Sequence, residues 1–269
     1  MKEIKVGGEM WNSQFKVMGL VAAMMLVGGI YGCKPVNEPV VDESAQKKES
    51  VDTAIPTILS KVVVMALPSA EVCQPEGCTQ YSIQTVETNV AWINEYFAER
   101  IRKADPVAFE EKPAEKIVFN DSENVGLSQS TTTVRFISQF GHIATFTIDS
   151  YIYNAGAAHG MSHTEYVNFD LKTKKRLALE DIIMKDAQPK ILNALYDANS
   201  IWLENHVIER SKLQLSDNFY YGVHGIVFVY PLYELASYAE GMSELTLPYR
   251  SAKALFKPEF MPSLPKYAN

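Results

Sequence analysis

Nothing in the sequence points to a nucleic-acid partner or to a membrane-spanning helix. Its 25 Lys and Arg residues are outnumbered by 32 Asp and Glu, which gives a formal charge of −7. Nucleic-acid phosphates are bound by clustered basic side chains, so this acidic composition argues against such a partner. The apolar run over residues 17–31 is also short, because a helix needs about 20 residues to cross the hydrocarbon core. A basic protein partner would suit the chain better.

Complete catalytic motifs are absent as well. The sequence holds neither the G-x-S-x-G nucleophile elbow nor the H-E-x-x-H pair of metalloproteases. The stretch GAAHG, residues 156–160, lacks the lysine of a phosphate-binding loop. Ser162 and His163 are neighbours and would point to opposite faces of a strand, so they cannot form a catalytic pair. We therefore expect no cofactor and no enzymatic activity.

Cysteine is scarce, with three in 269 residues. Cys73 and Cys78 stand close together in EVCQPEGCTQ, and an oxidising compartment would favour a disulfide between them. Pro75 and Gly77 suit a tight turn. Closing so small a ring contributes about 2 kcal/mol by the loop-entropy argument, so the bond would fix a loop rather than the fold.

The third cysteine, Cys33, stands at the end of a predicted signal peptide. Three lysines precede the apolar run, and Gly32 and Cys33 follow it. The segment IYGC resembles the lipobox of bacterial lipoproteins, in which the cysteine is diacylated and becomes the new N-terminus. The resemblance implies a lipid anchor at Cys33 and, because Lys34 rather than Asp follows, the outer membrane, facing the periplasm. Plain secretion with cleavage nearby is the alternative.

A polar tether and one folded region are expected after the cleavage site. Loss of the signal peptide removes three lysines and two glutamates, so the mature chain carries −8. The whole chain is 47% hydrophobic and 21% charged, enough for one substantial core or two small cores that share a seam. The expected segments are the signal peptide at 1–32, the tether at 33–56, a domain at 57–260 with halves of about 57–157 and 158–260, and a proline-containing tail at 261–269.

Strand patterns dominate the expected domain. Residues 131–140 and 143–154 are expected to pair as a hairpin around Gly141. Large apolar side chains alternate with polar ones along the second of these strands, which predicts one buried and one solvated face. The expected solvated side chains are Thr145, Thr147 and Asp149. Further strands are expected within 57–67, 81–86, 164–171, 225–231 and 243–249.

Two helices are expected to pack on these strands. The first spans about residues 89–101, with Thr88 or Asn89 as its cap and an apolar stripe formed by Val90, Ile93, Phe97 and Ile101. The second begins at Pro189, with a buried stripe formed by Leu192, Leu195, Ala198 and Trp202. The predicted fold class is α+β, a mostly antiparallel sheet packed by two main helices.

The glycine-rich stretch after residue 153 admits several interpretations. Gly156 and Gly160 would permit a positive φ where the strand reverses. His159 is then either a turn histidine that donates to a backbone carbonyl or a contact to a ligand or partner. His159 and His163, four residues apart, match a zinc spacing with the two paired cysteines only superficially, because the intervening chain is too long. No metal site is expected.

Two longer motifs carry a resemblance to a known domain family. YNAGAAHGMSHTEYVNFDLKTKKRLALEDI, residues 153–182, is similar to the Gly-Gly-Ala-His-Gly segment and the N-x-D-L … L-x-D-I pattern of the family shared by the anti-sigma factor RsiV and the non-catalytic region of the deacetylase PdaC. GIVFVYPLYELASYAEGMSELTLPY, residues 225–249, is similar to the second signature of that RsiV-like family. The resemblance covers about residues 57–260, with Ala157 in place of a glycine.

This resemblance implies an extracytoplasmic recognition domain. In RsiV the domain binds lysozyme, and in PdaC it is attached to a separate glycan deacetylase domain. A lysozyme-like hydrolase or peptidoglycan is therefore the expected partner. The candidate binding residues are Asn154, His159, His163, Tyr233 and Tyr238.

Two other functions stay open. The chain could be a cell-envelope hydrolase that acts on peptidoglycan through His159 and a carboxylate such as Asp149 or Glu165. It could also be a structural envelope lipoprotein without a specific ligand.

Overall fold

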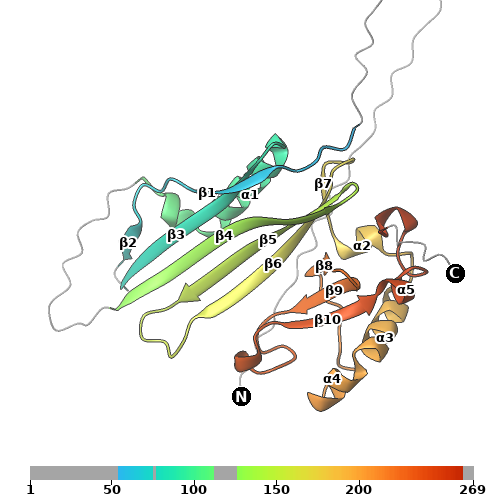
Figure 1. Cartoon of the computed structure of the whole chain (residues 1–269). Helices are drawn as coiled ribbons and strands as arrows, with labels where there is room; N and C mark the ends of the chain where they lie inside the picture. Colours follow the sequence, from blue (N-terminus) through green and yellow to red (C-terminus); the bar gives the residue numbers. More distant parts are fainter. Residues whose placement is uncertain (1–53, 75–76, 112–125, 263–269) are drawn as a thin grey trace, which may run out of the picture. The chain divides into compact units, whose positions relative to one another are not determined.

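The computed structural model describes residues 54–74, 77–111 and 126–262 (Figure 1). These ranges form a larger sheet of seven strands and a smaller sheet of three, with α1 and α3 as the two longer helices. The predicted signal peptide, Cys33 and residues 33–53 of the tether lie outside the described ranges. No helix within the described ranges is both long and apolar enough to cross a bilayer. The α+β class is confirmed.

The larger sheet has the strand order β1-β3-β4-β5-β6-β7, with β2 paired to β3. All of its pairs are antiparallel except β3–β4, and helix α1 lies in that parallel connection. The sheet takes strands from both expected halves of the domain. Its strands are β1 (Ser60–Val64), β2 (Glu71–Gln74), β3 (Gly77–Thr88), β4 (Leu127–Phe140), β5 (Ile143–Tyr153), β6 (Met161–Asp170) and β7 (Lys175–Leu177).

The hairpin between β2 and β3 carries the disulfide. Cys73 and Cys78 face each other in the strand register, with their Cα atoms 4.0 Å apart, and their sulfurs are bonded. The expected disulfide is therefore confirmed. It joins two residues that the strand pairing already brings together, so it secures the edge of the sheet rather than the core.

Helix α1 (Ala91–Ala104) lies against one face of the larger sheet (Figure 1). Its buried stripe is Ile93, Phe97 and Ile101, three of the four expected residues, because Val90 precedes the helix. The expected cap is wrong, because Val90 occupies the cap position and no side chain caps the helix. Thr88 is still paired with β1, and its hydroxyl donates to the side-chain Oδ1 of Asn94 at 2.8 Å instead of accepting a backbone N–H of the first turn.

The β4–β5 hairpin is confirmed, with Phe140 opposite Ile143 around Gly141. The expected solvated face of β5 is wrong, because Thr145 is 1% exposed and Thr147 is 4% exposed. The smaller sheet covers this face. Asn168, on β6 opposite Thr145, accepts the Thr145 hydroxyl at 2.7 Å and donates to the Phe219 carbonyl of the smaller sheet at 2.7 Å.

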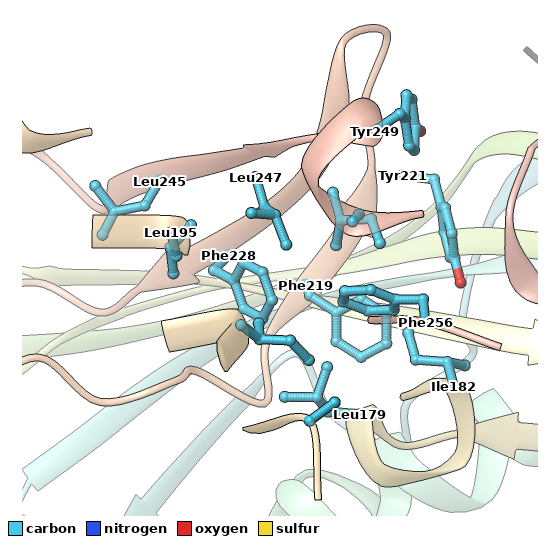
Figure 2. Close-up of a cluster of buried hydrophobic side chains, with 14 of the residues drawn as sticks. Leu179, Ile182, Leu195, Phe219, Tyr221, Phe228, Leu245, Leu247, Tyr249 and Phe256 are labelled. Atoms are coloured by element: carbon cyan, nitrogen blue, oxygen red, sulfur yellow. The ribbon is translucent and has the colours of Figure 1, made fainter. Parts of the chain in front are cut away.

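The smaller sheet has the order β10-β9-β8 and is antiparallel throughout. Its strands are β8 (Phe219–Tyr221), β9 (Gly225–Tyr230) and β10 (Ser243–Pro248). The expected pairing of the last two strands is confirmed. Figure 2 shows Phe219 and Phe228 of this sheet close to Leu179 and Phe256, side chains from elements on either side of it in the sequence. A second hydrophobic core therefore lies apart from the core under α1.

The expected second helix is two helices, α3 (Gln188–Ala198) and α4 (Ser200–Asn205). Its expected stripe is displaced, because the fully buried side chains are Ile191, Leu195 and Leu203 rather than Leu192, Ala198 and Trp202. Asn199 separates the helices. Its amide donates to the Thr246 carbonyl of β10 at 3.0 Å and accepts the Thr246 N–H at 3.2 Å, so a tertiary contact sets the break.

Short elements complete the described chain. The side chain of Asp181 caps helix α2 by accepting the Ala178 N–H at 2.9 Å. These elements are the helices α2 (Leu179–Ile182) and α5 (Tyr249–Ala252) and the 3-10 turns η1 (Pro106–Phe109), η2 (Tyr238–Glu240) and η3 (Pro258–Phe260).

Candidate functional site

The GAAHG stretch forms the reversal between β5 and β6. The Ala157 N–H donates to the Asn154 carbonyl at 2.9 Å, which closes the turn. Gly156 has a φ of +82°, in the left-handed region that glycine adopts without a Cβ penalty. The expected role of Gly156 as a positive-φ turn residue is confirmed.

Gly160 has a different role from the one expected. It is not among the positive-φ residues, so the expected backbone reason for this glycine is wrong. A Cβ at Gly160 would lie 2.3 Å from the Tyr151 ring, so the missing side chain makes room for that ring. The Gly160 carbonyl accepts the Tyr238 hydroxyl at 2.8 Å and the His159 Nδ1–H at 3.0 Å. The glycine therefore joins the loop to a distant segment.

Three aromatic rings meet at this loop, and we call His159, Tyr233 and Tyr238 the aromatic platform. The His159 and Tyr238 rings are stacked, with centroids 4.0 Å apart and planes 28° from parallel. Tyr233 and Tyr238 are 5.7 Å apart at 30°. The Tyr233 hydroxyl lies 3.3 Å from His159 Nε2 and can donate to it, because Nδ1 carries the proton given to Gly160. One tautomer thus satisfies both contacts of the imidazole.

Tyr233 is held in an unusual conformation. Its φ is +69°, a region that non-glycine residues rarely occupy, and its side chain is 56% exposed. Backbone strain of this kind persists only where the surrounding structure maintains it, and it is often found at functional sites. The strained residue is also the more exposed of the two tyrosines of the platform.

The turn that carries Tyr238 is held at its other end by an ion pair. His206 Nε2 lies 2.7 Å from the Glu240 carboxylate, and His206 Nδ1 donates to the Trp202 carbonyl at 2.8 Å. The pKa of His206 is raised, mainly by this backbone carbonyl and then by Glu240. The pKa of Glu240 is lowered, chiefly by its hydrogen bond to His206. Both ring nitrogens face acceptors, so the arrangement fits the imidazolium ion.

The other candidate residues lie elsewhere. His163 is on β6, opposite Ser150, and faces the same side of the sheet as α1. Asn154 contributes its main-chain carbonyl to the turn. The zinc combination of two cysteines with His159 and His163 does not form, because the sulfurs of Cys73 and Cys78 are bonded to each other.

The histidine and carboxylate of the hydrolase alternative are not paired. Asp149 is bonded to Arg135 and accepts the Thr164 hydroxyl at 2.8 Å. Glu165 binds Arg100 at 2.8 Å and Arg176 at 3.2 Å. The hydrogen bonds of His159 go to Gly160 and Tyr233 instead. Within the described ranges, neither carboxylate is placed to act with His159 as a general base.

Two residues of the site were missed by the sequence reasoning. Tyr151 fills the space that Gly160 leaves open. Met242 lies within the second signature, and its sulfur accepts the Thr164 N–H at 3.2 Å, which ties β6 to the segment before β10. The sequence could not indicate either role, because a tyrosine in a strand and a methionine in a loop are common residues that usually serve only in packing.

Comparison with known proteins identifies a shared fold and no function. Residues 169–250 match a family described as protein of unknown function (DUF3298). A crystal structure of a DUF3298 family protein from Pseudomonas aeruginosa PAO1 has a TM-score of 0.59 at 19% identity, covering 78% of this chain and 99% of that one. A DUF3298 member from Bacteroides fragilis gives 0.57 at 18% identity, covering 76% and 95%. No curated protein matches the chain.

At these identities the two structures show a shared fold. The expected RsiV-like relationship is supported only at the coarser level of the DUF3298 match. That match begins at the end of β6 and ends in α5, so it includes Tyr233 and Tyr238 but leaves out His159.

Proposed function

We propose that this chain is a non-enzymatic recognition domain and that the aromatic platform contacts its partner. The exposed, strained Tyr233 stacked beside Tyr238 is the observation that carries the proposal. Aromatic residues presented on rigid loops supply large contact area at low entropic cost, and they are enriched among binding hot spots. The platform is rigid because His159 and Tyr238 both bond to the Gly160 carbonyl.

The proposed partner is a lysozyme-like hydrolase or a cell-wall glycan. The resemblance to the RsiV-like family supports both. Stacked tyrosine faces suit sugar rings as well as the arginine-rich surface of a basic lysozyme. The net charge of −8 on the mature chain would speed encounter with a basic protein, an effect on association rate more than on partner identity.

Removal of the platform rings should abolish most of the binding. In calorimetry with lysozyme and with solubilised peptidoglycan, we expect Tyr233→Ala and His159→Ala to weaken the affinity of the full chain at least about tenfold. His224→Ala serves as the matched control, because His224 is exposed in the β8–β9 turn. Circular dichroism would verify that each variant is folded.

Wild-type affinity in the folded Tyr233→Ala variant would overturn the role of the platform. Binding of neither partner by the wild-type chain would favour a structural lipoprotein. Release of soluble fragments from labelled peptidoglycan, with or without a chelator, would instead indicate the hydrolase.

We also propose that a lipid at Cys33 holds the domain at the outer membrane, facing the periplasm. Each buried methylene of an acyl chain contributes about 0.8 kcal/mol, so several chains suffice for a stable anchor. Cells fed a labelled fatty acid should label the wild-type chain, and Cys33→Ser should remove the label. Unchanged membrane attachment of that variant would exclude the anchor.

A further inference from the structure

A groove of about 340 Å³ lies on the α1 face of the larger sheet. The last turn of α1 and Asp105 form one wall, and strands β4, β5 and β6 form the floor. We call it the α1 groove and define it by Asp105, Thr132, Ile148, Ser150, Ile152 and His163. It shares no residue with the aromatic platform, so it does not depend on the function proposed above.

The floor of the α1 groove has a polar row beside an apolar one. Thr132 on β4 is opposite Ser150 on β5, which is opposite His163 on β6, so the three side chains lie in line across the sheet. Ile148 and Ile152 flank Ser150 on the same face of β5. A ligand in the groove would therefore meet both hydroxyl groups and aliphatic surface.

Thr132 presents its hydroxyl to the groove. It is 7% exposed, yet within the described residues its hydroxyl makes no hydrogen bond. Its Oγ1 is not one of the fully enclosed oxygens without a partner, which among the described residues are those of Thr85 and Tyr221, so it borders the space of the groove. The hydroxyl is part of the groove lining, where a ligand could satisfy it.

Asp105 is also poorly satisfied. It stands at the C-terminal cap of α1, where the helix dipole disfavours a negative charge. It precedes η1, but its side chain makes no capping bond to that turn. Its carboxylate has no ion pair among the described residues, and its one side-chain hydrogen bond there is accepted from the Ser130 hydroxyl at 3.5 Å.

Neither Arg100 nor Tyr81, the neighbouring ionisable side chains, stabilises the negative charge of Asp105. Arg100, one turn back on α1, is committed to Glu165 of β6 at 2.8 Å. Tyr81 of β3 supplies only a neutral phenol, whose own pKa is raised by burial and by Asp105. Burial likewise raises the pKa of the Asp105 carboxyl, because a partly buried carboxylate loses hydration. A bound cation would offset this cost.

We propose that the α1 groove binds an aliphatic primary ammonium group, the side chain of a lysine or another diamino acid in a peptide. Asp105 is the counter-ion, Thr132 and Ser150 accept the remaining N–H donors, and Ile148 and Ile152 contact the methylene chain. A single uncommitted carboxylate supplies too few charged ligands for Ca²⁺. An ammonium ion needs only three acceptors.

Methyl NMR on the full chain labelled at isoleucine tests the proposal. Titration with Nα-acetyl-lysine methylamide should shift the methyl signals of Ile148 and Ile152, while Ile226 in the second core should not move. The norleucine analogue keeps the aliphatic chain and lacks the amine, and we expect it to bind at least about tenfold more weakly. Asp105→Asn should weaken lysine binding by a similar factor, and Asp217→Asn, at an exposed position, should leave it unchanged.

Thr132→Val separates ligand contact from folding. Because valine removes an unpartnered hydroxyl, the variant should be at least as stable as the wild type and yet bind the probe more weakly. Equal affinity for the lysine and norleucine probes would overturn the proposal, as would wild-type affinity in Asp105→Asn. Absence of any shift at Ile148 and Ile152 at saturating probe would also overturn it.

Discussion

Replacement of Gly225 by alanine is expected to lower the free energy of unfolding by about 3 kcal/mol. A Cβ at this first residue of β9 would lie 2.2 Å from the Leu247 carbonyl oxygen and 2.9 Å from the Pro248 Cα. These are backbone atoms of the paired strand β10, so no side-chain rotation can relieve the clash. The two strands would have to separate. For a domain of this size the melting temperature should fall by roughly 10 °C.

Gly156→Ala is the matched control for this variant. Gly156 has a positive φ, but nothing lies within 4 Å of its Cβ position. Alanine there should cost only about 1 kcal/mol, from backbone strain alone. Urea denaturation followed by circular dichroism would compare the two. If Gly225→Ala were no less stable than Gly156→Ala, the close approach of β9 and β10 would not be a constraint on the fold.

The loss of Asn168 should be at least as damaging, at about 4 kcal/mol in Asn168→Ala. This amide is 1% exposed and bonds to the Thr145 hydroxyl on one side and the Phe219 carbonyl on the other. Alanine would leave a buried hydroxyl and a carbonyl without these partners, and each loss costs about 1–3 kcal/mol, with a cavity in addition. Urea denaturation would measure the effect.

Two further variants measure how much of that loss of stability comes from the hydrogen bond between Thr145 and Asn168. Thr145→Val removes the hydroxyl and leaves Oδ1 of Asn168 without this donor, so we expect the free energy of unfolding to fall by about 1–2 kcal/mol. In the double variant the losses should be less than additive, because both changes break the same bond. Asn205→Ala, at the exposed end of α4, should change stability by less than about 0.5 kcal/mol. Full additivity would mean that the bond between Thr145 and Asn168 carries no free energy.

Local patterns in the sequence were sufficient for the longer strands and for one helix, whereas the short strands β2, β7 and β8 were not predicted. The hairpin around Gly141 and the stripe of Ile93, Phe97 and Ile101 depend on neighbours a few residues away, and both were predicted correctly. The prediction that Thr145 lies on a solvated face was wrong because the smaller sheet covers that face, where it bonds to Asn168 through Phe219 of β8. Strand β8 has only three residues. A strand so short has too few residues to show a period.

The candidate site was predicted in its parts and not in its geometry. His159 was identified from a glycine-rich turn, and Tyr233 and Tyr238 were identified from a family resemblance. Their contact joins segments more than 70 residues apart, which no local pattern encodes. Thr132 and Asp105 could not be identified from the sequence, because a threonine in a strand and an aspartate after a helix are ordinary until the groove that they line is seen.

The distance along the chain between the two parts of the platform has a consequence for how the protein matures. The loop that carries His159 belongs to the larger sheet, and Tyr238 comes from the segment between β9 and β10. Contacts between remote segments form late, because loop-closure entropy must be overcome first. A chain that has folded only its larger sheet therefore carries no platform. If the platform binds the partner as proposed, binding requires both sheets to be complete, and a molecule that has folded only its larger sheet would not bind.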